Sequence, residues 1–297
     1  MRDEITHLQS ERQETYATII KWLWRGVAAA ILAVILVFLV LSFTDLPSVK
    51  ELENPKSELA SQVYADNGEV FGRYYIENRV PVSFNDLSPV MVEALVATED
   101  ERFYQHSGID FRALMRAVVK TAILGQESSG GASTLTQQLA KLLFTERASS
   151  SITERLVQKL KEWIIALRLE RRYTKEEIIA MYLNKFDFLY DSYGIKAAAE
   201  TYFAKTQDSL NILESATLVG MLKNPSLYNP IRRTELTQQR RNVVLSQMVR
   251  NNFLTPAEYD TLKTKPLDIT RFNRSTHTEG LATYFRMVLA EDLKSLL

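Results

Sequence analysis

The chain contains no cysteine, which excludes disulfide bonds and metal sites built from thiolates. It has only 3 histidines, His7, His106 and His277, and they are too few and too scattered to predict a metal cluster. It also lacks net charge, because 36 basic residues balance 36 acidic residues. No overall positive field is therefore available to attract nucleic acid, and the basic residues have to be judged locally.

A stretch without charge is the clearest feature of the N-terminal part. No residue from Gly26 to Thr44 is charged, and this length matches the roughly 20 apolar residues that cross a bilayer. A cleaved signal peptide has a shorter apolar region of about 7–15 residues and a small-x-small cleavage site, neither of which this stretch has. A buried helix of a soluble protein is the alternative. Trp22 and Trp24 stand at its edge, where indole rings favour a membrane interface.

The charges around this stretch indicate its orientation. Basic residues flank it on both sides: Arg12, Lys21 and Arg25 before it, Lys50 and Lys56 after it. This positive-inside bias predicts a cytoplasmic N-terminus, with the bulk of the chain across the membrane. We therefore predict a cytoplasmic tail over 1–21 and a single transmembrane helix over 22–45.

The segment 46–85 is rich in β-prone and aromatic residues. Asp66-Asn67-Gly68 lies between two such runs, which is a pattern typical of a β-hairpin. We predict a small β-rich linker over this segment.

The periodicity becomes helical after Ser88-Pro89, which suit the N-cap and first position of a helix. Asp110 and Ser133 are the expected N-caps of the next two helices. Capping boxes predict further helix starts at Thr174, Asn211 and Thr255. No parallel-strand pattern interrupts these helices, so we predict a mainly α-helical domain over 86–265.

A carboxylate interrupts the apolar face of the first of these helices. Val92, Val96 and Phe103 share one face by their spacing, and Glu99 falls on that face. Partial burial there would raise the pKa of Glu99 and suit it to general acid–base catalysis. An acid at a helix end that faces solvent is the alternative, and spacing alone leaves both open.

The stretch around this acid resembles the first signature of the family 51 glycosyltransferases. These enzymes are the peptidoglycan polymerases of class A penicillin-binding proteins and of monofunctional transglycosylases. "EDERFYQHSGID" is similar to the pattern Glu-Asp-x-x-Phe-x-x-His-x-Gly. The matching residues are Glu99, Asp100, Phe103, His106 and Gly108.

Further motifs follow in the order of the family. "GASTLTQQLAKLLF" is similar to the second signature, except that Leu142 replaces an asparagine; the matching residues are Ser133, Thr134, Gln137, Gln138 and Lys141. "QKLKE" resembles the third signature, Arg-Lys-x-x-Glu, through Lys159 and Glu162. Gln158 replaces the arginine, whose charge could come from Arg147 or Arg155. "TKEEIIAMYLN", ending at Asn184, completes a resemblance that covers roughly Val63 to Val249.

The resemblance implies a lysozyme-like glycosyltransferase fold with a cleft between a large lobe and a smaller mobile lobe near the membrane. It implies that lipid II and the growing glycan strand are the substrates. They are joined into β-1,4-linked glycan with inversion, and polyprenyl pyrophosphate is released. It also implies a bacterial inner-membrane protein with its catalytic domain in the periplasm or outside the cell, and other cell-wall synthesis proteins as partners.

The resemblance also implies roles for individual residues. Glu99 is expected to be the catalytic base, and Glu162 to orient Lys159 or bind a cation, with a surface ion pair as the alternative. Arginine, lysine or a divalent cation such as Mg or Mn has to meet the pyrophosphate; no organic cofactor is expected. The candidate substrate-binding residues are Asp100, Phe103, His106, Arg116, Ser133, Thr134, Gln137, Gln138, Lys141, Lys159, Asn184 and Arg241.

Rival functions remain open. Paired carboxylates across a sugar-binding cleft also describe glycan-cleaving enzymes, although such enzymes meet no pyrophosphate. The replacements at Gln158 and Leu142 leave open a catalytically silent membrane scaffold for cell-wall enzymes. The arginine-rich segment 232–250 suggests nucleic acid by its charge, but its apolar residues favour a packed amphipathic helix, so no nucleic-acid partner is expected.

A second domain of class A penicillin-binding proteins is not recognisable. Neither Ser-x-x-Lys nor Lys-Thr-Gly, the motifs of the acyl-transfer domain, occurs in the sequence. We predict that 266–297 is the start of a linker to a missing transpeptidase domain, with a monofunctional enzyme as the alternative.

Overall fold

The computed structural model describes residues 16–29, 32, 36, 61–64, 66, 70–74, 81–124, 131–144, 151–274 and 288. The chain divides into two units, and each is described by itself. The first comprises Met1–Pro47 with Ser149–Ile164, and the second comprises Ser48–Ala148 with Ile165–Leu297.

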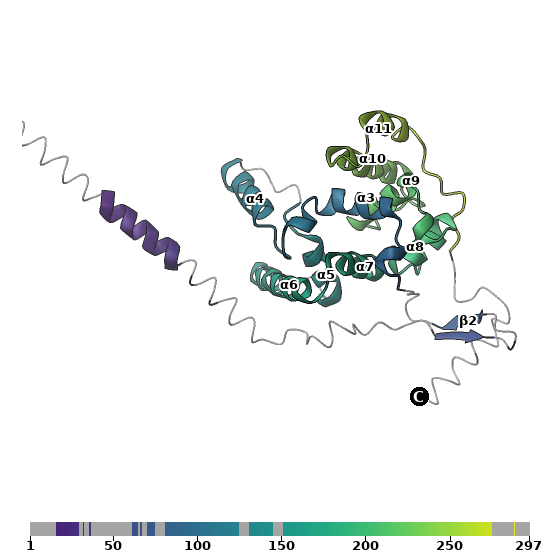
Figure 1. Cartoon of the computed structure of the whole chain (residues 1–297), viewed down its shortest axis with the longest axis horizontal. Helices are drawn as coiled ribbons and strands as arrows, with labels where there is room; N and C mark the ends of the chain where they lie inside the picture. The colour runs from purple at the N-terminus through teal and green to yellow at the C-terminus, as the bar shows by residue number, and fades with distance from the viewer. Residues whose placement is uncertain are drawn as a thin grey trace, which may run out of the picture. The chain divides into compact units, whose positions relative to one another are not determined.

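The first unit holds the predicted membrane anchor. Residues 16–29, 32 and 36 are helical and exposed, and Figure 1 draws this helix in purple. No helix within the described residues is both long and apolar enough to span a membrane. Most of the predicted span 22–45 lies outside the described residues, so the transmembrane helix and its orientation stay predictions.

The predicted hairpin is present in the second unit. Strands β1 (Ser61–Tyr64) and β2 (Val70–Tyr74) are antiparallel and lie on either side of the Asp-Asn-Gly stretch. The register pairs Val63 with Gly72 and then shifts, so that Tyr64 pairs with Val70. Much of 46–85 lies outside the described residues, and the extent of the linker stays a prediction.

The described part of the domain that follows is mainly helical, as predicted. Its elements are η1 (Phe84–Asp86), α3 (Pro89–Glu99), η2 (Phe103–Gln105), α4 (Phe111–Leu124), α5 (Leu135–Phe144), α6 (Ile152–Arg172), α7 (Lys175–Lys185), α8 (Gly194–Phe203), η3 (Gln207–Ser209), α9 (Ile212–Leu222), α10 (Thr234–Arg250) and α11 (Pro256–Leu262). The lysozyme-like arrangement of these helices stays a prediction.

Most predicted helix starts are confirmed. The side chains of Thr174, Asn211 and Thr255 each accept backbone N–H groups and complete a capping box. Asp110 accepts the N–H of Ala113 at 2.9 Å and caps α4. These contacts are short in sequence, which is why the motif alone predicts them.

Of the two serines predicted as N-caps, Ser88 has the predicted position without a side-chain cap, and Ser133 is replaced by the next residue. Ser88 occupies the N-cap position of α3, but its hydroxyl donates to the carbonyl of Leu210 and caps nothing. Thr134, and not Ser133, accepts the N–H of Gln137 at the start of α5. At α3 a carbonyl far away in the sequence takes the hydroxyl of the N-cap residue, and at α5 the next residue along the chain forms the cap.

The core positions the C-terminal end of α3. Helix α10 packs on α9 and on α3, α3 packs on α9, and α5 packs on α7. Leu95 of α3, Leu218 of α9 and Leu245 of α10 are fully buried, and each contributes about 1.5–3 kcal/mol relative to an exposed side chain. Glu99 ends α3 and therefore stands on a well-packed support.

The start of α8 depends on a glycine. Gly194 has φ +85°, and a Cβ built there would lie 2.8 Å from the carbonyl oxygen of Asn184. Gly131 also has a positive φ, +102°, but a Cβ there would meet nothing within 4 Å. Substituting both glycines therefore distinguishes the cost of backbone strain, which both share, from the cost of a steric clash, which only Gly194 has.

We expect Gly194→Ala to lower the free energy of unfolding by about 2–4 kcal/mol, because strain and overpacking add. The matched change Gly131→Ala should cost only the strain, about 1–2 kcal/mol. Urea unfolding followed by circular dichroism measures both. Equal losses in the two variants would show that the close approach to Asn184 is unimportant.

Candidate active site

A cavity with a volume of about 630 Å³ opens beside the end of α3 in the second unit. Its wall comes from α3, the loop 100–110, α4, the segment 131–134, the end of α9 and α10. It carries both acids and cations. The acids are Glu99, Asp100, Glu101 and Asp110, and the cations are Arg116, Lys120, Lys223, Arg240 and Arg250.

Glu99 is a partly buried acid in the wall of this cavity. Its side chain is only 15% exposed, and Gln138 Nε2 donates to Oε2 at 3.1 Å. Arg240 approaches Oε1 to 3.7 Å. Burial raises the pKa of Glu99 above its ordinary value, and this effect outweighs the hydrogen bond from Gln138 and the charges of Arg240 and Lys223, which lower it. A carboxylate in this environment is suited to accept a proton.

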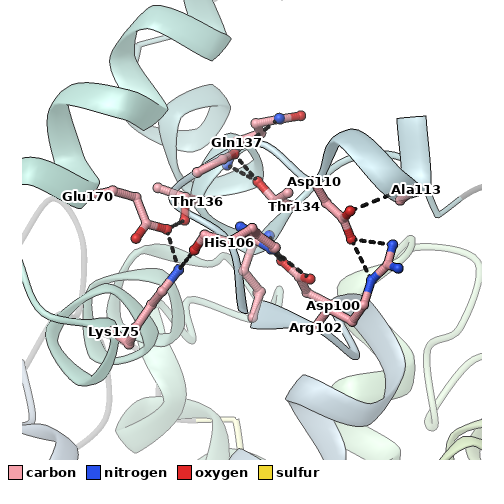
Figure 2. Close-up of polar contacts among 12 residues, drawn as sticks. Asp100, Arg102, His106, Asp110, Ala113, Thr134, Thr136, Gln137, Glu170 and Lys175 are labelled. Atoms are coloured by element: carbon pink, nitrogen blue, oxygen red, sulfur yellow. Dashed lines mark hydrogen bonds and ion pairs between the residues drawn. The ribbon is translucent and has the colours of Figure 1, made fainter. Parts of the chain in front are cut away.

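Asp100 and His106 brace the loop after α3, as Figure 2 shows. His106 Nε2 lies 3.1 Å from both carboxylate oxygens of Asp100, and the backbone N–H of Leu135 donates to one of them at 3.0 Å. Arg102 donates to Asp110 through two nitrogens, at 2.6 and 2.9 Å. These contacts join the loop 100–110 to the start of α5.

The ligand atoms of Asp100, His106 and Asp110 lie within 4.8 Å of one another, close enough to hold a metal ion. The oxygens of both aspartates are already used by Arg102 and by backbone N–H groups. We therefore assign no metal to this group.

The second signature contributes different residues to different tasks. Thr134 Oγ1 and Gln137 Nε2 both donate to the carbonyl of Gly108, and both residues are buried. Ser133 and Thr134 line the cavity. Gln138, the next residue along α5, turns its amide to Glu99. Gln137 therefore holds the loop at Gly108, while Gln138 binds the candidate base Glu99.

Phe103 belongs to the core beneath the loop. It is fully buried, and the ammonium of Lys175 lies 4.2 Å from the centre of its ring. The same ammonium donates to Glu170 at 2.8 Å and to the carbonyl of His106 at 2.7 Å, and Figure 2 shows the lysine between these two partners. The predicted contact of Phe103 with substrate stays untested, and its position indicates a packing role.

Of the cations predicted to bind substrate, Arg116 lines the cavity and Lys141 does not. Arg116 Nη1 lies 3.7 Å from the carboxylate of Glu101, and Arg250 approaches the same carboxylate to 4.0 Å. Lys141 is exposed in the last turn of α5. The predicted role of Lys141 therefore has no support from the lining of this cavity.

The expectation for Arg241 needs correction. Arg241 is fully buried, and its guanidinium donates to the side chain of Asn242 and to backbone carbonyls, the shortest contact being 2.6 Å to Lys265. Its neighbour Arg240 lines the cavity instead. Successive helical residues point about 100° apart, and the spacing of buried Val244 and Leu245 places Arg241 on the core face. That spacing could have distinguished the two arginines.

The side chain of Asn184 binds the protein backbone, which does not support the predicted substrate contact. Its side chain accepts the N–H of Val82 at 3.1 Å and donates to the carbonyl of Val82 at 2.8 Å. Both ends of the amide are therefore engaged with the backbone that leads into the domain. Asn184 does not line the cavity.

Lys159 and Glu162 lie in the first unit. Lys159 Nζ is 2.9 Å from Glu162 Oε2, and Glu162 is buried while Lys159 is more than one-third exposed. The ion pair that the spacing allows is present. The roles proposed for the two residues, and the separation of Glu162 from Glu99, stay untested. Arg155 is exposed on the same helix, and Arg147 lies outside the described residues.

Comparisons with known proteins identify the class. The family model described as transglycosylase matches residues 67–249, so the chain belongs to the transglycosylase family. Penicillin-binding protein 1A of Escherichia coli (strain K12) is 39% identical over 224 residues, which are 75% of this chain and 26% of that protein. Penicillin-binding protein 1A of Aquifex aeolicus (strain VF5) is 37% identical over 249 residues, 84% of this chain and 34% of that protein.

The chain thus spans only about a quarter to a third of the length of these curated relatives. A crystal structure of penicillin-binding protein 1A from Haemophilus influenzae matches 80% of this chain and 25% of its own, with 22% identity and a TM-score of 0.42. At that score the comparison does not assign the fold.

The raised pKa of Glu99 predicts a pH-dependent gain in stability when its charge is removed. The folded state binds this proton more tightly than the unfolded chain, whose carboxyl has the ordinary pKa of 4.5. Its contribution to stability is therefore present below about pH 4.5 and is lost as the pH rises through the higher folded value. We expect Glu99→Gln to raise the free energy of unfolding by about 0.5–2 kcal/mol at neutral pH and by much less in acid.

Urea unfolding at neutral pH and in acetate buffer measures this difference. Glu93→Gln is the matched control, because Glu93 lies on the same helix and does not line the cavity. A gain for Glu99→Gln that stays equal at both pH values would contradict a desolvated carboxylate.

Proposed function

We propose that this chain is a peptidoglycan glycosyltransferase of bacterial cell wall synthesis. It polymerises lipid II into β-1,4-linked glycan strands with inversion and releases polyprenyl pyrophosphate. One observation carries the proposal: a desolvated carboxylate, Glu99, stands in a cavity whose wall also holds several cations. Membership of the transglycosylase family supports it.

Glu99 acts as the general base in this proposal. It accepts the proton of the acceptor's 4-hydroxyl while that oxygen attacks the anomeric carbon of the donor sugar. The bond from this carbon to the pyrophosphate oxygen breaks in the same displacement, so the configuration inverts. Burial brings the pKa of Glu99 closer to neutral pH, and a base is most effective when its pKa lies near the working pH.

The cations of the cavity meet the departing pyrophosphate. Arg116, Lys223 and Arg240 line the same wall as Glu99, and fixed positive charge stabilises a leaving group that gains negative charge. Arg240 has a second effect, because its charge lowers the pKa of Glu99 and helps to keep the base ionised. A divalent cation, Mg or Mn, remains an alternative source of this charge.

The setting of the reaction belongs to the proposal as well. The uncharged stretch Gly26–Thr44 supports a single transmembrane anchor, and the lipid-linked substrate favours an enzyme held at the membrane. We place the N-terminus in the cytoplasm and the catalytic domain in the periplasm or outside the cell. Other cell-wall synthesis proteins are the proposed partners.

Incubation with lipid II tests the proposal against its rivals. We expect wild type to form polymer, and Glu99→Gln to lose about 10²–10⁴ in rate while still binding lipid II. Glu93→Gln should polymerise normally. Cleavage of preformed glycan would favour a glycan-cleaving enzyme, and no product of either kind would favour a silent scaffold. Wild-type rates in Glu99→Gln would show that another group is the base.

Charge removal in the cavity tests the leaving-group site. We expect Lys223→Met to weaken kcat/KM for lipid II by roughly 10–150-fold, because a hydrogen bond to a charged group is worth about 1.5–3 kcal/mol. Lys263→Met is the matched control, since the side chain of Lys263 is 41% exposed, pairs with Asp260 and does not line the cavity.

Lys141→Met in the same assay tests the residue that the family resemblance implies. If kcat/KM falls in Lys141→Met but not in Lys223→Met, the pyrophosphate binds outside this cavity.

A further inference from the structure

A chain of hydrogen bonds leads from the core to Glu99. The hydroxyl of Tyr182, on α7, donates to Gln138 Oε1 at 3.0 Å. Gln138, on α5, donates from Nε2 to Glu99 Oε2 at 3.1 Å. Glu99 is the last residue of α3. Tyr182 and Gln138 are 44 positions apart in the sequence, and Gln138 and Glu99 are 39 positions apart. The two hydrogen bonds therefore link three helices that are distant in the sequence.

The chemistry of these groups allows only one direction of donation. A glutamine amide has one acceptor end and one donor end, whereas an ionised carboxylate only accepts. Burial raises the pKa of Tyr182 well above its ordinary value, so the phenol keeps its proton at working pH. The donor end of the amide, Nε2, is used by the carboxylate of Glu99. The acceptor end, Oε1, therefore faces Tyr182 and accepts its phenol proton.

Tyr182 is itself rigidly placed. Its side chain is 1% exposed and its ring packs beside that of Phe186, with centroids 6.2 Å apart. Helix α7 packs on α5, which carries Gln138. The hydroxyl is therefore a fixed point relative to the amide, which has rotatable bonds of its own.

Glu99 has few other constraints. The charged groups that face it are Arg240 from α10, Lys223 at the end of α9 and its neighbour Asp100. Arg240 is 3.7 Å from the carboxylate, beyond an ordinary hydrogen bond. Within the described residues, Gln138 supplies the hydrogen bond to this carboxylate. Anchoring Oε2 leaves Oε1 as the oxygen available to a substrate proton.

We propose that Tyr182 is a positioning residue for the glycosyltransfer reaction, which acts by locking the Gln138 amide so that it donates to Glu99. The inference rests on the proposed role of Glu99 as the base. Without the phenol hydroxyl the amide rotates, and its oxygen faces the carboxylate for part of the time. The carboxylate then loses both its fixed orientation and part of the stabilisation of its ionised form.

The variant Tyr182→Phe keeps the ring and removes the hydroxyl. We expect kcat for lipid II polymerisation to fall about 3–10-fold with little change in KM. We also expect the acidic limb of the pH–rate profile to move upward by about half to one pH unit. The sign follows because a weaker hydrogen bond to the ionised form raises the pKa of Glu99, and the base is active only when ionised.

Tyr202→Phe is the matched control. Tyr202 is also fully buried and, like Tyr182, does not line the cavity, but its hydroxyl donates to the carbonyl of Phe188 at 2.6 Å and not to Gln138. Thermal melting should show a comparable loss of stability in both variants. Only Tyr182→Phe should move the acidic limb, since a purely structural role would leave the pH profile unchanged.

A double variant tests the route of the effect. In a Gln138→Ala background, Tyr182→Phe should cause almost no further loss of kcat, because the amide that it orients is gone. An equal loss in both backgrounds would overturn the inference. An unchanged pH profile in Tyr182→Phe would also overturn it, while an inactive Glu99→Gln would leave the base assignment standing. A fully active Glu99→Gln would remove the proposed function and this inference together.

Discussion

The free-energy cost of burying the carboxylate of Glu99 determines which side chains have to surround it. Glu99 ends a helix whose preceding residues, Leu95 and Val96, are buried in the core. A charge in that position is unfavourable unless hydrogen bonds and opposite charges surround it. The neighbouring helices supply them: α5 brings the amide of Gln138, and α10 brings the guanidinium of Arg240.

The other acids beside the cavity also have partners that stabilise their charge. Asp100 could compete with Glu99 as a base, but it accepts from His106 and from the backbone of Leu135. Asp110 is likewise engaged by Arg102. Pairing these acids leaves Glu99 as the carboxylate whose pKa burial raises. The site thus separates one reactive acid from structural ones by giving the latter their own partners.

The conformation of the helices was predictable wherever the signal is local. The capping boxes at Thr174, Asn211 and Thr255 form as expected, because cap and partner are three residues apart. The hairpin at the Asp-Asn-Gly stretch is also local. Ser88 occupies the predicted N-cap position, but its hydroxyl donates to the carbonyl of Leu210, 122 residues away, and does not cap the helix. No local pattern contains that partner.

For the candidate site, the sequence by itself determined that Glu99 follows Val92 and Val96 on one helix face and that Gln138 and Lys141 match another signature of the same family. Only the tertiary structure decided that Arg240 and not Arg241 lines the cavity, that Lys223 joins it, and that the hydroxyl of Tyr182 reaches the Gln138 amide. The physical reason is that helix periodicity sets which residues share a face, while the partner of that face depends on packing between helices far apart in sequence.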